Sequence, residues 1–150
     1  MNYKGHIIGG VVTYVLILYL LKFINYPFDT IHNVQWFLLC ILGSLFPDID
    51  TKSKIQLWIY RLLFIFYILL IINNPNIQIM IFTSILAIIP LIVRHRGLFH
   101  QPSFLIGLPL IIVCIISFIQ PAKASEALIN ALFFIAGALS HLLLDKSRRT

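Results

Sequence analysis

Long apolar runs separated by short polar breaks dominate the chain. There are six: Ile7–Ile24, Ile31–Phe46, Ile55–Ile72, Ile77–Val93, Phe104–Ile119 and Ala127–Leu144. A bilayer-spanning helix needs about 20 apolar residues, with about 17 as the lower end. Four runs meet that length; the second and fifth are slightly shorter, which leaves open a tilted or incomplete crossing. The runs lack period-2 alternation, and helices satisfy their own backbone groups in lipid. We therefore predict an all-α polytopic membrane bundle of about six transmembrane helices, one domain over residues 1–150.

Proline and asparagine mark the breaks between the runs. The turn-forming sequences are Asn25-Tyr26-Pro27, Phe46-Pro47-Asp48, Asn73-Asn74-Pro75-Asn76, Gln101-Pro102 and Gln120-Pro121. Pro90 lies inside the fourth run and is expected to kink it. The first run is too long for the apolar region of a secretory signal, and no A-x-A-like site follows it, so we expect it to be retained as a helix.

Composition favours a surface that faces lipid. The chain is 60% hydrophobic and only 11% charged, with a mean hydropathy of +0.98, whereas a soluble domain carries roughly 25% charged residues. The two cysteines, Cys40 and Cys114, lie in apolar runs without CxxC or Cys/His spacing. We expect both to be small buried apolar side chains without a redox or ligand role.

The net charge of +6 informs topology rather than nucleic-acid binding, because these apolar runs give no basic face with interleaved aromatic residues. If the N-terminus is cytoplasmic, nine basic residues fall on the cytoplasmic side and two, Lys22 and Lys123, on the other. Cytoplasmic loops are enriched in Lys and Arg, so we predict cytoplasmic N- and C-termini. The nine are Lys4, Lys52, Lys54, Arg61, Arg94, Arg96, Lys146, Arg148 and Arg149.

The same topology gathers most of the histidine and acidic residues on one face. Asp29, His32 and Glu126 fall on the opposite side, and His32 is left out of the predicted site. A polar residue at a helix end means little alone, but convergence from four separate parts of the sequence favours a shared site. The seven residues on the cytoplasmic face are His6, Asp48, Asp50, His95, His100, His141 and Asp145.

Two pairs carry most of this prediction. His141 and Asp145 are spaced i, i+4, which puts them on one helical face about 5–6 Å apart at Cβ, close enough to share a metal. An ionisable residue after a membrane run is a functional candidate; the alternative is a helix-end histidine beside a solvated aspartate. Asp48 and Asp50 follow Pro47 directly. Asp48 is the stronger ligand candidate, and Asp50 either binds metal or orients a histidine; alternatively, both acids simply meet water.

The loop from Arg94 to His100 supplies the other candidates. His95 and His100 are five residues apart and cannot share a helical face, but Gly97 permits a turn that brings them together. Arg94 and Arg96 suit an anion such as phosphate, since a guanidinium binds two oxygens at once. The alternative is a basic loop on lipid headgroups with incidental histidines.

His6, before the first run, is a predicted ligand because it shares the face of the others. Gly9 and Gly10 beside it would let another helix approach closely. Mixed histidine and carboxylate ligands suit zinc, manganese or iron better than calcium, which prefers oxygen ligands. Seven candidates exceed the three protein ligands of one catalytic zinc, so we expect one or two divalent ions, zinc first.

Four elements together resemble a known family: His6, Gly-Ser-Leu-Phe-Pro-Asp-Ile-Asp (43–50), His-Arg-Gly-Leu-Phe-His (95–100) and Ser-His-Leu-Leu-Leu-Asp (140–145). The chain resembles the YdjM-like family of inner-membrane proteins, which implies a membrane-embedded metal-dependent hydrolase. That family usually has Thr before the second loop histidine and Ser after it, where this chain has Phe99 and Gln101. The ligands are kept, but two hydroxyl groups that could contact substrate are not. The helical His-x-x-x-Asp pattern alone also resembles helical zinc-dependent phospholipase C and P1 nuclease sites.

The sequence thus predicts a metal-dependent hydrolase at the cytoplasmic membrane face. The seven cytoplasmic His and Asp residues would bind metal, and Arg94, Arg96 and Asp50 are the catalytic candidates. The metal would lower the pKa of a bound water, and an arginine would stabilise the developing charge. The headgroup location favours a phosphoester or lipid substrate, with membrane lipids as partners and no nucleic acid; the oligomeric state stays open. Alternatives are a non-catalytic metal-stabilised scaffold, or a proton or divalent-cation transporter, disfavoured because the run centres lack acids and histidines.

Overall fold

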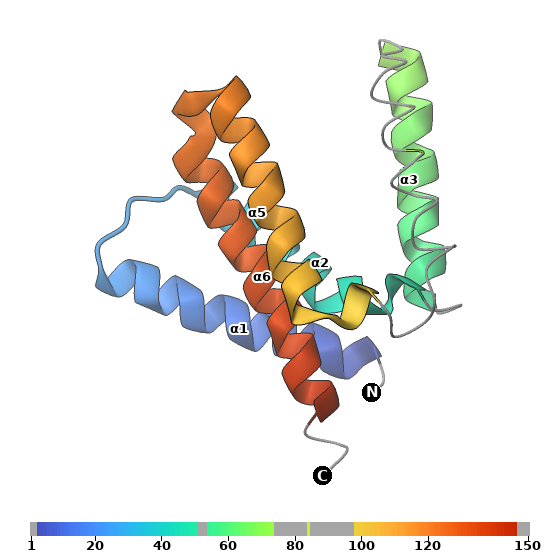
Figure 1. The fold of residues 1–150 in the computed structure, drawn as a ribbon, viewed down its shortest axis with the longest axis horizontal. Helices are drawn as coiled ribbons and strands as arrows, with labels where there is room; N and C mark the ends of the chain where they lie inside the picture. The colour runs from blue at the N-terminus through green and yellow to red at the C-terminus, as the bar shows by residue number, and fades with distance from the viewer. Residues whose placement is uncertain (1–2, 51–53, 74–83, 85–97, 147–150) are drawn as a thin grey trace. The chain divides into compact units, whose positions relative to one another are not determined.

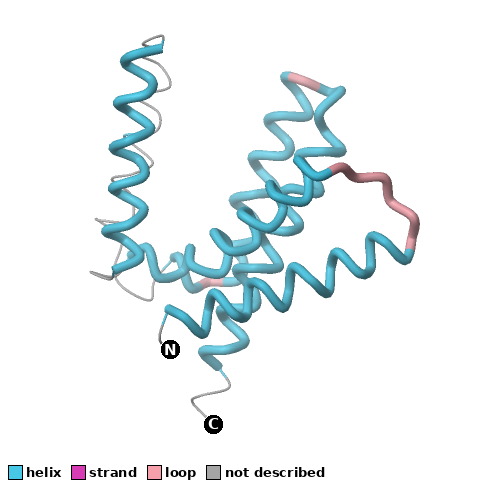
Figure 2. Tube along the Cα trace, turned by 180° about the vertical axis from the view of Figure 1, so that it is seen from behind, coloured by secondary structure: helices cyan, strands magenta, loops and turns pink. Residues whose placement is uncertain are grey.

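The computed structural model describes residues 3–50, 54–73, 84 and 98–146, and within them every regular element is helical (Figures 1 and 2). The predicted all-α class is therefore confirmed for these residues. The fourth apolar run, with Pro90, lies outside them. The elements are α1 (Tyr3–Phe23), α2 (Thr30–Leu45), a 3-10 turn (Phe46–Asp50), α3 (Lys54–Asn73), a 3-10 turn (Leu98–His100), α5 (Pro102–Ile119), a 3-10 turn (Pro121–Lys123) and α6 (Ala124–Lys146).

Four of these helical segments are long and apolar enough to cross a membrane, spanning residues 3–23, 30–49, 102–119 and 121–146. α3 is a further apolar helix of 20 residues. The two short runs reach membrane length because α2 continues into a 3-10 turn and α5 begins at Pro102, where a proline suits the first helical position.

Large apolar side chains cover the outer surfaces of the helices. Phe118 is 89% exposed, and Phe23 and Ile31 are also open; lipid is the solvent such side chains require. The predicted burial is right for Cys40, which is fully buried, and wrong for Cys114, which is exposed on α5. The physical reason is that α5 packs mainly against α6, so its other side faces outward.

The chain forms two compact units, residues 1–47 with 100–150, and residues 48–99. In the first, α6 packs against α1, α2 and α5; Figure 1 shows α5 beside α6 and α1 crossing it. Because α6 packs against several helices, its buried residues form two stripes at helical spacing. One stripe consists of Phe133, Gly137 and His141. In the second unit, the hydroxyls of Tyr67 on α3 and Ser84 form a hydrogen bond of 2.8 Å.

The first predicted break is a helix-ending motif followed by a capped start. Asn25 adopts a left-handed conformation, φ 54°. The Tyr26 N–H donates to the Leu21 carbonyl and the Asn25 N–H to the Lys22 carbonyl, the bond pair of a Schellman motif. α2 then begins at an N-cap, where the Asp29 carboxylate accepts from the His32 N–H at 2.8 Å.

Glycines let the helices of the first unit approach closely. A Cβ on Gly137 would collide with the Cys40 carbonyl of α2, and one on Gly43 would collide with the Phe134 carbonyl of α6. On α1, Cβ positions at Gly9 and Gly10 would meet Leu144 and Ser44. The predicted close approach at Gly9 and Gly10 is confirmed. Backbones that touch in this way bring the ends of α1, α2 and α6 to one place.

Candidate metal centre

Two buried histidines and one carboxylate meet where α1 crosses the last turns of α6. The rings of His6 and His141 stack with centroids 3.7 Å apart and planes 14° apart. Each faces one oxygen of Asp145: His6 Nε2 lies 3.5 Å from Oδ1, and His141 Nε2 lies 3.7 Å from Oδ2. His6 is 1% exposed and His141 0%. The site therefore gathers two nitrogen donors and one carboxylate on a largely buried face.

The orientation of His141 is set by α2. Its Nδ1 lies 2.7 Å from the Ser44 main-chain carbonyl oxygen. A carbonyl only accepts hydrogen bonds, so Nδ1 must carry the proton. The Nε2 of a neutral ring then has a lone pair directed away from Ser44. Metal-binding histidines characteristically donate their other ring N–H to a backbone carbonyl or carboxylate in this way.

His100 lies on a second side of His141. The two ring centroids are 5.7 Å apart, and the planes are near perpendicular at 78°. His100 reaches this position because it ends the 3-10 turn just before α5, which packs along α6. A further imidazole from a separate part of the sequence thus lies beside His141.

The remaining predicted residues fall outside this unit or outside the described residues. Asp48 and Asp50 belong to the 3-10 turn Phe46–Asp50 in the second unit. Arg94, His95 and Arg96 lie outside the described residues. The first unit therefore brings together His6, His100, His141 and Asp145 from the predicted set.

The donor types and their spacing suit a divalent metal, which both imidazoles would bind once the stacked rings of His6 and His141 tilt toward each other. One nitrogen or oxygen from each of His6, His141 and Asp145 lies within 4.8 Å of the other two. Donors around a tetrahedral zinc at about 2.0–2.2 Å lie roughly 3.3–3.6 Å apart, close to the 3.5 and 3.7 Å between each imidazole and the carboxylate. Two imidazoles with one carboxylate form a ligand set used by catalytic zinc and by non-haem iron.

Sequence reasoning missed the contribution of Ser44, whose carbonyl orients His141. The usable signal is in the sequence: Ser44 lies near the end of the apolar run Ile31–Phe46, and Pro47 follows three residues later. A proline at that distance removes the N–H that would otherwise bond this carbonyl in a 3-10 turn.

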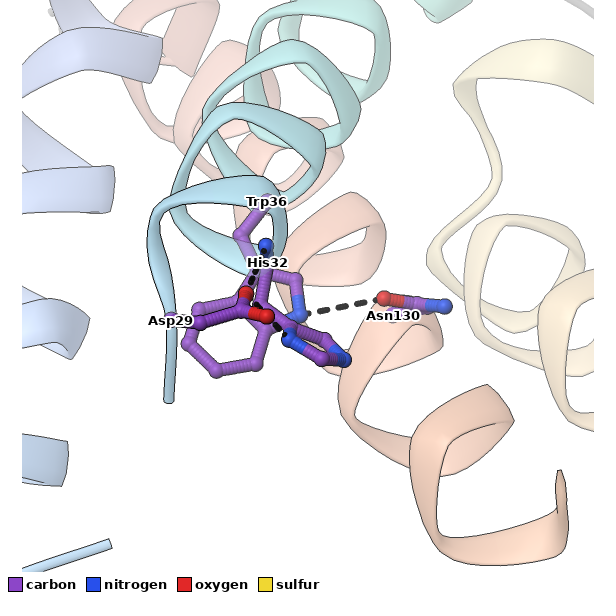
Figure 3. Close-up of polar contacts among 4 residues, drawn as sticks. All are labelled: Asp29, His32, Trp36 and Asn130. Carbon is purple, nitrogen blue, oxygen red and sulfur yellow. Dashed lines mark hydrogen bonds and ion pairs between the residues drawn. The ribbon is translucent and has the colours of Figure 1, made fainter. Parts of the chain in front are cut away.

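A second polar cluster lies at the other end of α2, away from this centre (Figure 3). The Asp29 carboxylate accepts the backbone N–H of His32 and also contacts the His32 ring, whose Nδ1 lies 2.6 Å from it. The Trp36 indole N–H donates to Asn130 Oδ1 on α6 at 3.0 Å, and the Trp36 ring stacks on Phe133. The hydrogen bonds from His32 lower the pKa of Asp29 below the usual carboxyl value. His32 is 37% exposed and Asp29 60%, so this pair acts as a helix cap.

In the part of the chain that the structure describes, these features define a helical membrane protein with a largely buried histidine–carboxylate cluster at one end of its membrane-length helices. The chain belongs to the YdjM inner membrane protein family, whose model matches residues 1–148. The resemblance predicted from the sequence is confirmed, and with its membrane-length helices the protein is an inner membrane protein. No curated protein and no solved structure matches the chain.

Proposed function

We propose that this protein is a metal-dependent hydrolase whose centre faces the cytoplasm. The observation that carries the proposal is the convergence of His6, His141 and Asp145. The Nδ1 of His141 is also hydrogen-bonded to the main-chain carbonyl of Ser44. Two imidazoles and a carboxylate gathered at the end of a membrane helix form a donor set that suits a divalent cation.

The residues of the cluster are proposed to bind the metal and to leave one side open to substrate. His6, His141 and Asp145 would hold a divalent ion, zinc first and manganese or iron next. His100, whose ring lies beside that of His141, is proposed as a further ligand. When bound, such an ion supplies Lewis acidity that makes water nucleophilic near neutral pH. Asp145, 21% exposed, is the donor open to an incoming substrate.

The residues of the loop and turn complete the proposal. Asp48 and His95 are proposed as further ligands, which would allow a second ion, and Asp50 as a ligand or as the partner of a histidine. Arg94 and Arg96 would bind the anionic part of a substrate and stabilise the charge that develops on it. Because the centre lies at a helix end, where headgroups lie, the proposed substrate is a phosphoester or a lipid carrying one.

The proposed topology has six spans and cytoplasmic termini. Ser44 at the end of α2 and His100 before α5 both lie beside His141, so the chain leaves and re-enters the first unit on the same face. The segment between them must cross the membrane an even number of times. α3 is long enough for one crossing, and the apolar run Ile77–Val93 is long enough for the return. The excess of Lys and Arg in the sequence on the side of the centre supports a cytoplasmic face.

The first test is the metal content of the detergent-purified protein, measured by elemental analysis in wild type, His6→Ala, His141→Ala and His32→Ala. His32 is the matched control, because it also pairs with an aspartate but lies at the opposite end of the first unit. We expect one or two equivalents of zinc, manganese or iron in wild type and His32→Ala, and loss of at least one in the other two. A wild type that is metal-free and takes up none on reconstitution would overturn the proposal.

A second candidate function is a membrane scaffold stabilised by the same metal. It is favoured by one observation, the near-complete burial of both imidazoles, which suits a closed structural site. The metal-loaded protein distinguishes the two when it is offered soluble phosphoesters, carboxylic esters and phospholipid vesicles. Hydrolysis that is lost in His141→Ala supports the enzyme; a full complement of metal without hydrolysis of any of them supports the scaffold.

A further inference from the structure

The end of α2 changes its hydrogen-bonding pattern at the point where it meets His141. The Phe46 N–H donates to the Gly43 carbonyl, three residues back, and the chain continues as the 3-10 turn Phe46–Asp50. In this pattern each carbonyl is bonded by the N–H three residues later. The next carbonyl in line is that of Ser44, and its donor would be residue 47.

Residue 47 is a proline and has no N–H to donate. Pro47 therefore cannot donate to the Ser44 carbonyl, and that oxygen is met by His141 Nδ1 at 2.7 Å. Ser44 and His141 are both 0% exposed, so neither group can turn to water. The Ser44 hydroxyl is engaged elsewhere, donating to the Ile41 carbonyl at 2.8 Å.

We propose that Pro47 is a positioning residue that fixes the tautomer of His141 by keeping the Ser44 carbonyl open to its Nδ1–H. The consequence for the centre follows from ring chemistry. With the proton on Nδ1, the neutral ring presents an Nε2 lone pair toward Asp145. With the proton on Nε2, the same nitrogen becomes a donor to Asp145 and can no longer bind a cation.

The importance of this device for metal binding rests on the proposed function, but the tautomer does not. Replacing Pro47 by alanine restores an N–H three residues after Ser44, which can bond the same carbonyl and weaken its hydrogen bond from His141 Nδ1. The ring then loses its fixed acceptor, and its proton can move to Nε2, which has the Asp145 carboxylate 3.7 Å away. Pro47→Ala should therefore populate the tautomer that wild type excludes.

The test is long-range proton–nitrogen NMR of the metal-free protein in detergent, with nitrogen-15 in the histidine rings. It is run at about pH 8.5, well above the ordinary imidazole pKa of about 6.5; the His141 signals are identified by their loss in His141→Gln. We expect the Nδ1–H pattern in wild type and a mixture or the Nε2–H pattern in Pro47→Ala. We also expect zinc affinity to fall roughly 10–100-fold in Pro47→Ala, the usual effect of losing a group that orients a ligand. Pro109→Ala is the matched control, because it removes a proline inside α5 of the same unit and should change neither readout.

The outcomes separate this inference from the proposed function. An Nε2–H ring in wild type overturns the inference, and so does a Pro47→Ala ring that keeps the wild-type pattern. The wild-type spectrum tests the Nδ1–H tautomer of His141 even if Pro47→Ala does not fold. Wild type that shows the Nδ1–H ring but binds no metal leaves the inference standing and overturns the metal centre. If wild type and Pro47→Ala bind metal equally and their histidine rings show the same tautomer, the inference is overturned and the metal centre stands.

Discussion

Two histidine–aspartate pairs lie at opposite ends of the first unit, and their surroundings give them different roles. Asp29 and His32 are exposed and only 2.6 Å apart, which is a local cap on α2. His141 is buried and lies 3.7 Å from the partly exposed Asp145, and the imidazole of His6 stacks on it. A close exposed pair contributes little beyond its own turn, whereas His141 and Asp145 belong to the donor cluster proposed to bind metal.

At the residue scale the sequence predicts which side chains form the site but only part of its geometry. The i, i+4 spacing of His141 and Asp145 is sufficient to place them on one face. The stacking of His6 on His141 depends on where α1 crosses α6, and the acceptor for His141 depends on which turn of α2 faces it. Both are tertiary facts that no local pattern in the sequence contains.

The lowered pKa of Asp29 predicts a pH dependence at the far end of α2. Because the folded-state pKa is depressed, the cap stabilises the fold fully above the ordinary carboxyl pKa of about 3.9. That stabilisation is lost as pH falls through the lowered value. Asp29→Asn keeps an acceptor oxygen but cannot ionise, so its thermal stability should lie closer to that of wild type in acid than at neutral pH. Melting curves of the detergent-solubilised proteins over this pH range test the sign; a gap that stays constant with pH would contradict it.

At the scale of elements, α6 organises the first unit. It packs against three helices, and small residues on it and on its neighbours set the distance between their backbones. The apolar runs predict that these helices exist, to within a few residues, because hydrophobicity and proline breaks are local properties. They do not predict that α2 packs against α6, since glycine permits close approach without specifying the partner.

The contact at Gly137 predicts a sharp difference between two glycine substitutions. Gly137→Ala places a methyl group against the Cys40 carbonyl and should force α2 and α6 apart, at about 1–3 kcal/mol, the range for overpacking. Gly107 on α5 has nothing within 4 Å of its Cβ position, so Gly107→Ala should be neutral or should stabilise the helix by about 0.5–1 kcal/mol. Thermal unfolding in detergent measures both. Equal melting temperatures for the two variants would mean that the α2–α6 contact is looser than described.

At the scale of the whole molecule, the decisive property is which membrane face each helix end meets. Within the first unit the starts of α1 and α5 and the ends of α2 and α6 surround the centre. The sequence predicts this alternation from the order of its runs. The orientation relative to the cytoplasm depends on Lys and Arg residues of both units, five of the nine on the predicted cytoplasmic side lying in residues 48–99, so that part rests on charge counting alone.

The proposed orientation can be tested by labelling single cysteines. Reporters at Lys22 and Lys123 should react in intact cells with a maleimide that cannot cross the inner membrane, and reporters at Lys4 and Lys146 only after permeabilisation. Cys40 and Cys114 are first replaced by alanine, since Cys114 is exposed on α5. The reverse pattern would place the centre on the opposite face, and labelling of all four in intact cells would contradict the spanning arrangement of α1 and α6.

The pairing of His6 with His141 also has a consequence for how the protein is made. His6 lies on the first helix to leave the ribosome, whereas His141 and Asp145 lie on α6, which follows all the other described helices. During synthesis the imidazole of His6 therefore lacks its contacts with His141 and Asp145 until α6 has been inserted and packed against α1. No nascent chain that lacks α6 can bring His6, His141 and Asp145 together, so a chain stalled before that helix could not form the proposed metal centre.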